Sequence, residues 1–229
     1  MSPVVNGKTH HFVSKGMYNG LILLGDQESG SYWDHITGEC VFGPLKGYKL
    51  STFPLLQMNA AQALSSYPTI QVAISKLTVF QRVIAFFMEW SRKSKRGFFP
   101  SVFKKTMGEE DTRCSLMDKG FGIWTDTTHR YYPAEVLRKH GGALIDELDR
   151  KRVVIFIDPT SSIPGAIYTN ATKCTWQDKS LHLDTGEIIR GSTLYDMQGV
   201  AQKGERPMQL FSRWYGFAYT FPGCEVYEK

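Results

Sequence analysis

The densest group of chemically reactive residue types in this chain lies in one short segment. Trp33-Asp34-His35 is followed by Glu39 and Cys40, with Thr37-Gly38 between them. Glycine tolerates the positive φ that tight turns need, so Thr37-Gly38 predicts a two-residue turn between two strands. Imidazole, carboxylate and thiol groups within one hairpin could bind a soft metal ion or support acid–base chemistry.

The same residues also fit an ordinary structural role. In a strand, Trp33 and His35 would share one face and Asp34 would lie on the other, so one hairpin does not direct all these groups at one ion. A metal ion is therefore possible, but no ligand motif supports it. The candidate catalytic residues are Asp26, Asp34, His35 and Glu39, and the candidate metal ligands are His35 and Cys40.

Other familiar catalytic and metal-binding motifs are missing from the sequence. The four cysteines, Cys40, Cys114, Cys174 and Cys224, contain no Cys-x-x-Cys pair, which excludes a zinc ribbon or a thioredoxin-like site. There is no Gly-x-Ser-x-Gly and no His-Glu-x-x-His. His10 and His11 would face opposite sides of a strand predicted from residue 10 to residue 14, so they should not chelate one ion together.

Composition and charge describe an ordinary globular chain with a β-rich bias. Of 229 residues, 42% are hydrophobic and 13% aromatic, and 21 are glycine, which favours strands and tight turns. The net charge is +5, but six cations fall between Ser91 and Lys105 without an acidic residue, so the rest of the chain is close to neutral. A general nucleic-acid binder is not indicated.

That basic segment follows a predicted amphipathic helix over residues 77–95. Apolar residues recur there at spacings of three and four: Leu77, Phe80, Val83, Ile84, Phe87 and Trp90. The helix would end in Arg92, Lys93, Lys95 and Arg96. Its apolar face would pack on its own protein or a protein partner, or lie on an anionic membrane surface. No apolar run is long enough for a transmembrane helix.

Two segments of the chain share the same order of turn residues and predict an internal repeat. Thr37-Gly38-Glu39 and Thr185-Gly186-Glu187 are each followed by a glycine and later by an aromatic-proline step. We expect an α+β fold, mainly antiparallel β, in two related units that each end in a hairpin and a short helix. The units would span 1–76 and 119–229, joined by a connector over 77–118 with the long helix, all within one compact domain.

Local signals predict the shorter elements. The apolar runs 21–24 and 153–157 read as buried strands, and Asp158-Pro159 ends the second. Short helices are expected over 58–64, over 134–139 after Pro133, and over 208–219. The second and third of these belong to the second unit.

Several short motifs, taken in order, resemble the prokaryotic family of proteins of unknown function DUF3179. They include Tyr18-Asn19-Gly20, Ser31-Tyr32-Trp33, Thr37-Gly38-Glu39, residues 43–47, Arg130-Tyr131-Tyr132-Pro133 and Asp158-Pro159. The resemblance covers nearly the whole chain apart from the connector helix. It also implies that the chain begins inside its first unit, after paired cysteines that many members carry, so no role of those cysteines transfers here.

Two functional hypotheses follow. The first is a non-catalytic binding or scaffold module, favoured by the lack of a complete catalytic motif and by the amphipathic helix. The second is a metal-dependent or redox enzyme with its site in the first β-rich unit. As the sequence begins, it predicts a cytoplasmic location, with the cell envelope as the alternative if further residues precede Met1.

Overall fold

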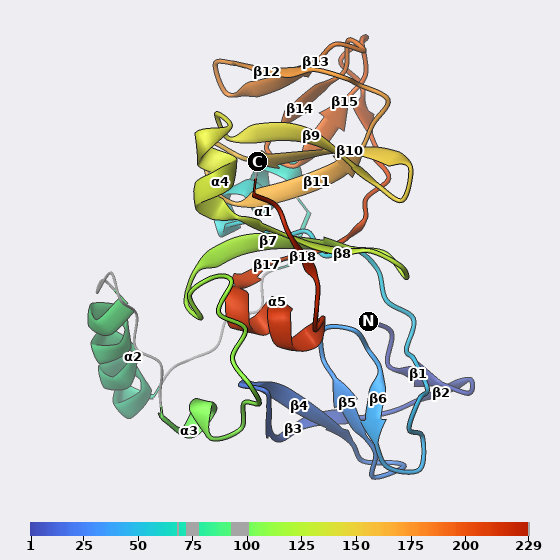
Figure 1. The fold of residues 1–229 in the computed structure, drawn as a ribbon, viewed down its shortest axis with the longest axis vertical. Helices are drawn as coiled ribbons and strands as arrows, with labels where there is room; N and C mark the ends of the chain where they lie inside the picture. The colour runs from blue at the N-terminus through green and yellow to red at the C-terminus, as the bar shows by residue number, and fades with distance from the viewer. Residues whose placement is uncertain (68, 72–77, 93–100, 229) are drawn as a thin grey trace.

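The protein is built mainly from short antiparallel β-sheets that follow one another along its longest axis (Figure 1). The computed structural model describes residues 1–67, 69–71, 78–92 and 101–228. Helices are few and short within this part of the chain. The prediction of a β-rich fold with mostly antiparallel strands is confirmed.

The N-terminal part forms a four-stranded sheet, drawn in blue in Figure 1. In spatial order its strands are β3 (Phe12–Tyr18), β4 (Leu21–Asp26), β5 (Tyr32–Asp34) and β6 (Cys40–Phe42). Asn19 and Gly20 join β3 to β4 with φ of 52° and 73°, the paired positive values of a type I′ hairpin turn. Trp33 and Cys40 pair across β5 and β6 and are fully buried. Val5 from the small hairpin of β1 (Val4–Val5) and β2 (Lys8–Thr9) completes this core.

The middle of the molecule is a second four-stranded sheet. Its spatial order is β17 (Met208–Arg213), β7 (Lys119–Trp124), β8 (His129–Pro133) and β18 (Glu225–Val226). Only the pairing of β18 with β8 is parallel among the described strands. The helix α5 (Trp214–Thr220) packs against this sheet through Phe217, whose ring lies directly over the backbone of Gly122.

Two further sheets complete the C-terminal half. One contains β9 (Ala143–Leu148), β10 (Lys151–Ile157) and β11 (Pro164–Tyr168), with β10 in the centre. The other contains β12 (Cys174–Gln177), β13 (Ser180–Leu183), β14 (Ile188–Arg190), β15 (Thr193–Tyr195) and β16 (Ala201–Gln202). The side chains of residues 153–156 are fully buried because β10 has apolar clusters on both faces. The predicted helix after Pro133 is present as α4 (Ala134–Lys139).

The two Thr-Gly-Glu segments form turns of different length. Around Thr37, the N–H of Asp34 donates to the carbonyl of Glu39 at 2.9 Å, which encloses four residues. Around Thr185, the N–H of Leu183 donates to the carbonyl of Glu187 at 3.0 Å, which encloses three. The two-residue turn predicted at residues 37–38 is wrong, because the Asp34 carboxylate accepts the N–H groups that follow it and ends β5 early.

A closer match joins two loops that the repeat motifs did not single out. Asp26 ends β4, and Asp158 follows directly on β10. Each carboxylate accepts the backbone N–H groups two and three residues later, at distances between 2.7 and 2.9 Å, and the hydroxyl of Ser29 or Ser161. Each aspartate also donates its own N–H to the carbonyl five residues later, at 2.9 and 3.0 Å. The loop at Asp34 follows the same pattern: its carboxylate accepts the N–H groups of Ile36 and Thr37 and the Thr37 hydroxyl, and its own N–H donates to the carbonyl of Glu39, so this loop is built three times.

The helix expected over 58–64 is displaced by two residues, to α1 (Ala60–Ser66). Asn59 and Gln62 exchange side-chain-to-backbone bonds in a capping box, which sets the start of the helix. The segment before α1 reaches the C-terminal half, where the Gln57 amide donates to the carbonyl of Phe211 at 3.2 Å. Figure 1 shows α1 beside the C-terminal sheets, far from the first sheet.

The helix predicted over 208–219 divides into the strand β17 and the helix α5. Residues 208–213 pair with β7 along its whole length, from Met208 opposite Trp124 to Arg213 opposite Lys119. Helical backbone begins only at Trp214, where this pairing ends. Long-range strand pairing therefore overrides the local helical pattern in the first half of the segment.

The predicted connector contains the helix α2 (Val79–Arg92), followed by the short helix α3 (Ser101–Lys104). Thr78 and Gln81 form a capping box at the start of α2. Leu77, Lys93 and Lys95 of the predicted 77–95 span lie outside the described residues. In Figure 1, α2 stands apart from the sheets. None of the helices in the described part of the chain has the length and apolar character needed to cross a membrane.

Candidate metal centre

A buried carboxylate organises the loop between β4 and β5. Oδ1 of Asp26 accepts the N–H groups of Glu28 and Ser29 at 2.9 and 2.8 Å. Oδ2 accepts the hydroxyl of Ser29 and the indole N–H of Trp33, the latter at 3.3 Å. The Asp26 side chain is completely inaccessible to solvent. Its orientation is therefore fixed by four donors rather than by packing alone.

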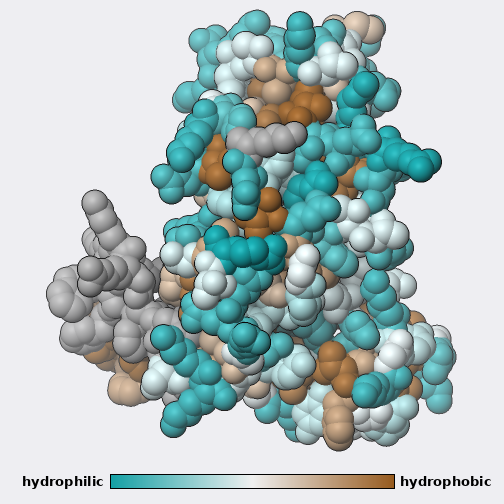
Figure 2. All heavy atoms as spheres, in the orientation of Figure 1, coloured by the Kyte–Doolittle hydropathy of each residue, from teal (hydrophilic) through white to brown (hydrophobic). Residues whose placement is uncertain are grey.

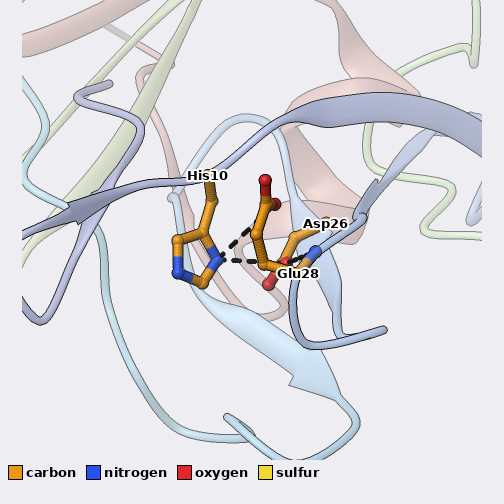
Figure 3. A group of neighbouring side chains, drawn as sticks. All are labelled: His10, Asp26 and Glu28. Carbon is orange, nitrogen blue, oxygen red and sulfur yellow. Dashed lines mark hydrogen bonds and ion pairs between the residues drawn. The ribbon is translucent and has the colours of Figure 1, made fainter.

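Two histidines lie against the acidic side of this loop, and Figure 3 draws one of them, His10, with Asp26 and Glu28. Nδ1 of His10 lies 3.0 Å from Oδ1 of Asp26 and 4.0 Å from Oε2 of Glu28. Nδ1 of His11 lies 2.6 Å from Oε1 of Glu28, and the His11 N–H donates to Oε2 at 2.8 Å. Strand β3 begins only at Phe12, so the expected opposite orientation of the two histidines does not apply, and both reach Glu28.

One buried nitrogen in this group faces both carboxylates. The His10 side chain is only 10% exposed, and its Nδ1 has no aligned hydrogen-bond partner among the described residues although Asp26 lies close by. A buried polar atom without a partner is costly, and an ion or an unassigned proton commonly explains such an atom. Figure 3 shows this nitrogen directed at the two carboxylates.

The spacing of these atoms suits one metal ion. His10, Asp26 and Glu28 each offer a ligand atom, and the three atoms lie within 4.8 Å of one another. Ligands that are each about 2.1 Å from an ion cannot be much more than about 4.2 Å apart. The 3.0 and 4.0 Å separations from His10 Nδ1 meet this limit. One imidazole and two carboxylates suit a borderline divalent ion better than the soft ion expected for a thiolate.

The electrostatics of the loop favour ionised carboxylates. Burial raises the pKa of Asp26, but bonds from the Ser29 side chain and backbone and the nearby His10 outweigh it and leave the pKa below its ordinary value. Bonds from the His11 side chain and backbone likewise lower the pKa of Glu28. Both carboxyls are thus available as anions near neutral pH.

Acid should therefore loosen the contact between the His10-His11 segment and the loop. Because the folded-state pKa of each carboxyl lies below its unfolded value, their contribution to stability is complete above about pH 4.5 and is lost as the pH falls through the folded-state pKa. We expect the difference in melting temperature between the wild type and Glu28→Gln to shrink steadily as the pH is lowered into that range.

Calorimetric scans between neutral and acidic pH measure this difference. The matched control is Glu109→Gln, which removes an exposed carboxyl on a segment remote in sequence from the loop. Its difference from the wild type should stay small throughout. A wild-type advantage over Glu28→Gln that is the same at every pH would show that the charge on Glu28 does not hold this contact.

The other candidate residues from the first hairpin do not converge on one point. Asp34 accepts the N–H groups of Ile36 and Thr37 and holds its own turn. Nδ1 of His35 lies 2.9 Å from the carbonyl of Ile22. Glu39 is exposed, whereas the Cys40 thiol is buried, which raises its pKa. The structure brings none of these groups to Asp26 except Cys40, whose pKa the Asp26 charge also raises.

The basic residues predicted as a surface are only partly described. Arg92 is the last residue of α2, and Lys93, Lys95 and Arg96 lie outside the described residues. Sequence reasoning named Asp26 but missed His10 and Glu28. The available signal was the Asp-x-Glu-x-x-Ser pattern of residues 26–31 together with His10-His11, but no local rule brings residue 10 to residue 26.

The fold and this centre together define a class of protein: a β-rich chain of mainly antiparallel sheets with a histidine–carboxylate cluster in its first sheet. The chain belongs to the family described as Protein of unknown function (DUF3179), whose model matches residues 2–221. No curated protein and no solved structure matches the chain. The family resemblance seen in the sequence motifs is confirmed.

Proposed function

We propose that this protein is a metal-binding module whose first sheet holds a divalent transition-metal ion. The observation that supports the proposal most directly is the position of His10 Nδ1, in a side chain only 10% exposed, 3.0 Å from Oδ1 of Asp26 and 4.0 Å from Oε2 of Glu28. His10, Asp26 and Glu28 would be the protein ligands. Zn²⁺ is the ion best matched to one imidazole and two carboxylates in a partly closed site.

The surroundings of Asp26 support this role. Ligating carboxylates in metal sites are usually held by further hydrogen bonds, and here Ser29 and Trp33 hold the Asp26 carboxylate in place. Glu28 retains 35% of its side-chain exposure, so an ion could reach the site from solvent on that side. A ligand set of three also occurs in catalytic zinc sites, and the hypothesis of a metal-dependent enzyme rests on that likeness alone.

We also infer that the two β-rich units are related. The loops at Asp26 and Asp158, one in each unit, share the same hydrogen bonds, and the loop at Asp34 in the first unit shares them too. Among the described residues, histidines lie against the Asp26 loop and not against the Asp158 loop, because the segment before Phe12, which pairs with Asp26, carries His10 and His11. On this proposal, one unit kept or gained an ion site and the other serves as its support.

Zinc binding to the purified chain tests the proposal. We expect His10→Ala to weaken the binding of Zn²⁺ by about tenfold or more, because one of three ligands is lost. Equilibrium dialysis with metal analysis gives the affinity. Glu28→Gln should weaken binding in the same direction.

The matched control is His35→Ala, which removes a histidine from the same sheet, one whose Nδ1 contacts a backbone carbonyl. It should leave zinc affinity within about twofold, a free-energy change below about 0.5 kcal/mol. If His35→Ala abolished binding and His10→Ala did not, the ion would lie at the hairpin that the sequence indicated. If the wild type bound no Zn²⁺, the proposal would fail outright.

A further inference from the structure

A cavity of about 330 Å³ lies where the segment after β6 meets the ends of β7 and β8. Lys49 and Thr52 line it from that segment, and residues 205–208 line it from the start of β17. Figure 1 shows the segment after β6 passing the ends of β7 and β8 on its way to α1. The volume is at the lower end of the range for small-molecule sites, roughly 300–1,000 Å³. None of the three proposed metal ligands lines this cavity.

Arg206 brings a positive charge to the cavity wall without a carboxylate beside it. Its half-buried guanidinium donates to the backbone carbonyls of Ala166, at 2.9 Å, and of Ser192. No carboxylate of the described residues forms an ion pair with it, and burial lowers the pKa of Arg206 to about 10. A guanidinium has five N–H donors, so three remain after these two bonds. A buried charge without a counter-ion is costly, and a bound anion would remove that cost.

The two acidic residues in the wall each have a cation of their own. Asp126 lies 3.6 Å from Nζ of Lys49, which also belongs to the wall. Glu205 lies 3.0 Å from Nζ of Lys151, which does not line the cavity. Neither acid therefore compensates Arg206, and the wall has one positive charge without a partner.

Aromatic rings provide an apolar surface in the same cavity. Trp124 and Phe221 are 9% and 7% exposed, and the His129 ring stacks on Phe221 with 4.4 Å between the ring centroids. Burial lowers the pKa of His129, and the charge of Lys49 lowers it further. The imidazole is thus neutral near pH 7 and adds no second positive charge. The wall combines flat apolar surfaces with one cation.

We propose that this cavity binds a small organic monocarboxylate, with its carboxylate on Arg206 and its apolar body against the aromatic rings. The planar guanidinium matches the geometry of a carboxylate and can bind both of its oxygens. One negative charge balances the charge of Arg206. A phosphate monoester carries more negative charge and would meet Asp126 and Glu205 in the same wall.

The surface of the molecule favours a small ligand over a protein partner. In Figure 2 the described side chains on the face shown are mostly hydrophilic, and the brown ones form small separate groups. Protein-binding surfaces commonly show a larger continuous apolar patch. The proposed carboxylate site shares no residue with the metal centre, so it goes beyond the proposed zinc binding and does not depend on it.

Titration of the full chain with benzoate, without added metal and followed by amide NMR, tests the proposal. We expect a dissociation constant of about 1 mM or below, with shifts at Thr125, His129 and Arg206. Benzamide has the same shape without the charge and should bind about tenfold or more weakly. Phenyl phosphate should bind no more tightly than benzoate.

Two variants locate the anion. Arg206→Gln should weaken benzoate binding by about tenfold or more and remove the preference for benzoate over benzamide. The matched control is Arg152→Gln, because Arg152 also donates to a backbone carbonyl, that of Asn170, but does not line this cavity. Its affinity for benzoate should stay within about twofold of the wild type. The amide spectrum of each variant shows whether it is folded.

Several results would overturn the proposal. Wild-type protein that gives no saturable shifts with benzoate, or that binds benzamide equally well, would do so directly. Tighter binding of phenyl phosphate would assign the site to a different class of anion. Shifts confined to residues outside the cavity wall would place the anion elsewhere even if Arg206→Gln did not fold. Loss of binding in Arg152→Gln but not in Arg206→Gln would do the same.

Discussion

Replacement of Asp26 by alanine is expected to destabilise the protein by about 3–5 kcal/mol and to abolish zinc binding. The substitution removes an acceptor that serves four donors, among them the buried indole N–H of Trp33. A buried donor left without an acceptor costs about 1–3 kcal/mol, and the loop that joins β4 to β5 would lose its internal support at the same time. Urea unfolding followed by circular dichroism measures the change.

Two comparison variants separate the effect of Asp26 on the stability of the loop from the effect of its charge on zinc binding. Asp26→Asn keeps one oxygen acceptor and the side-chain shape, so it should cost clearly less stability than alanine while still removing the ionised ligand. Asp158→Ala disrupts the matching loop, which has the same bonds to Ser161 but no histidine among its described contacts. It should destabilise the protein without weakening zinc binding under native conditions. A loss of less than about 1 kcal/mol in Asp26→Ala would mean that the carboxylate does not hold the loop.

Gly122→Ala is expected to destabilise the protein by about 3 kcal/mol or more. An added Cβ would lie 2.1 Å from Cε2 of Phe217, far inside van der Waals contact. Neither the backbone of β7 nor the ring of Phe217 can move away easily. Gly122 sits in the middle of β7, paired with Leu210 on one side and Tyr131 on the other, and Phe217 is fully buried. Thermal and urea unfolding of the purified variant measure the loss.

A glycine elsewhere provides the control. Gly108 is exposed, and a Cβ built there meets no atom within 4 Å, so Gly108→Ala should change stability by less than about 0.5 kcal/mol. Combining Gly122→Ala with Phe217→Ala should cost less than the sum of the two single changes, because the second removes the clash that the first creates. Strict additivity would show that the ring and the glycine are not coupled.

The local elements were largely open to prediction because their signals are local. The strand 153–157 and the helix after Pro133 were found where apolar runs and proline geometry indicated them. The helix expected over 208–219 was partly wrong, because pairing with β7 is a long-range contact that no window of sequence contains. The two-residue turn predicted at Thr37 was wrong for a local reason. The Asp34 carboxylate accepts the N–H groups of Ile36 and Thr37, which lengthens the turn.

The candidate site also combines a residue that its own segment indicated with residues that only long-range contacts bring to it. Asp26 was named from its own segment, whereas His10 was set aside because adjacent histidines in a strand point apart. The structure places His10 and His11 before the strand, and the register of β3 against β4 brings this segment to the loop after Asp26. Register is set by the whole sheet, so neither histidine could be assigned to its carboxylate from spacing alone.

The sequence by itself determined the β-rich class, the family, the amphipathic character of α2 and the lack of a complete catalytic motif, because composition, periodicity and motif order are properties of the chain. Tertiary structure alone decided which loops correspond, where residues 208–213 pair and which groups surround Asp26. Those features depend on contacts between residues far apart in the chain, and their energies exist only once the sheets have formed.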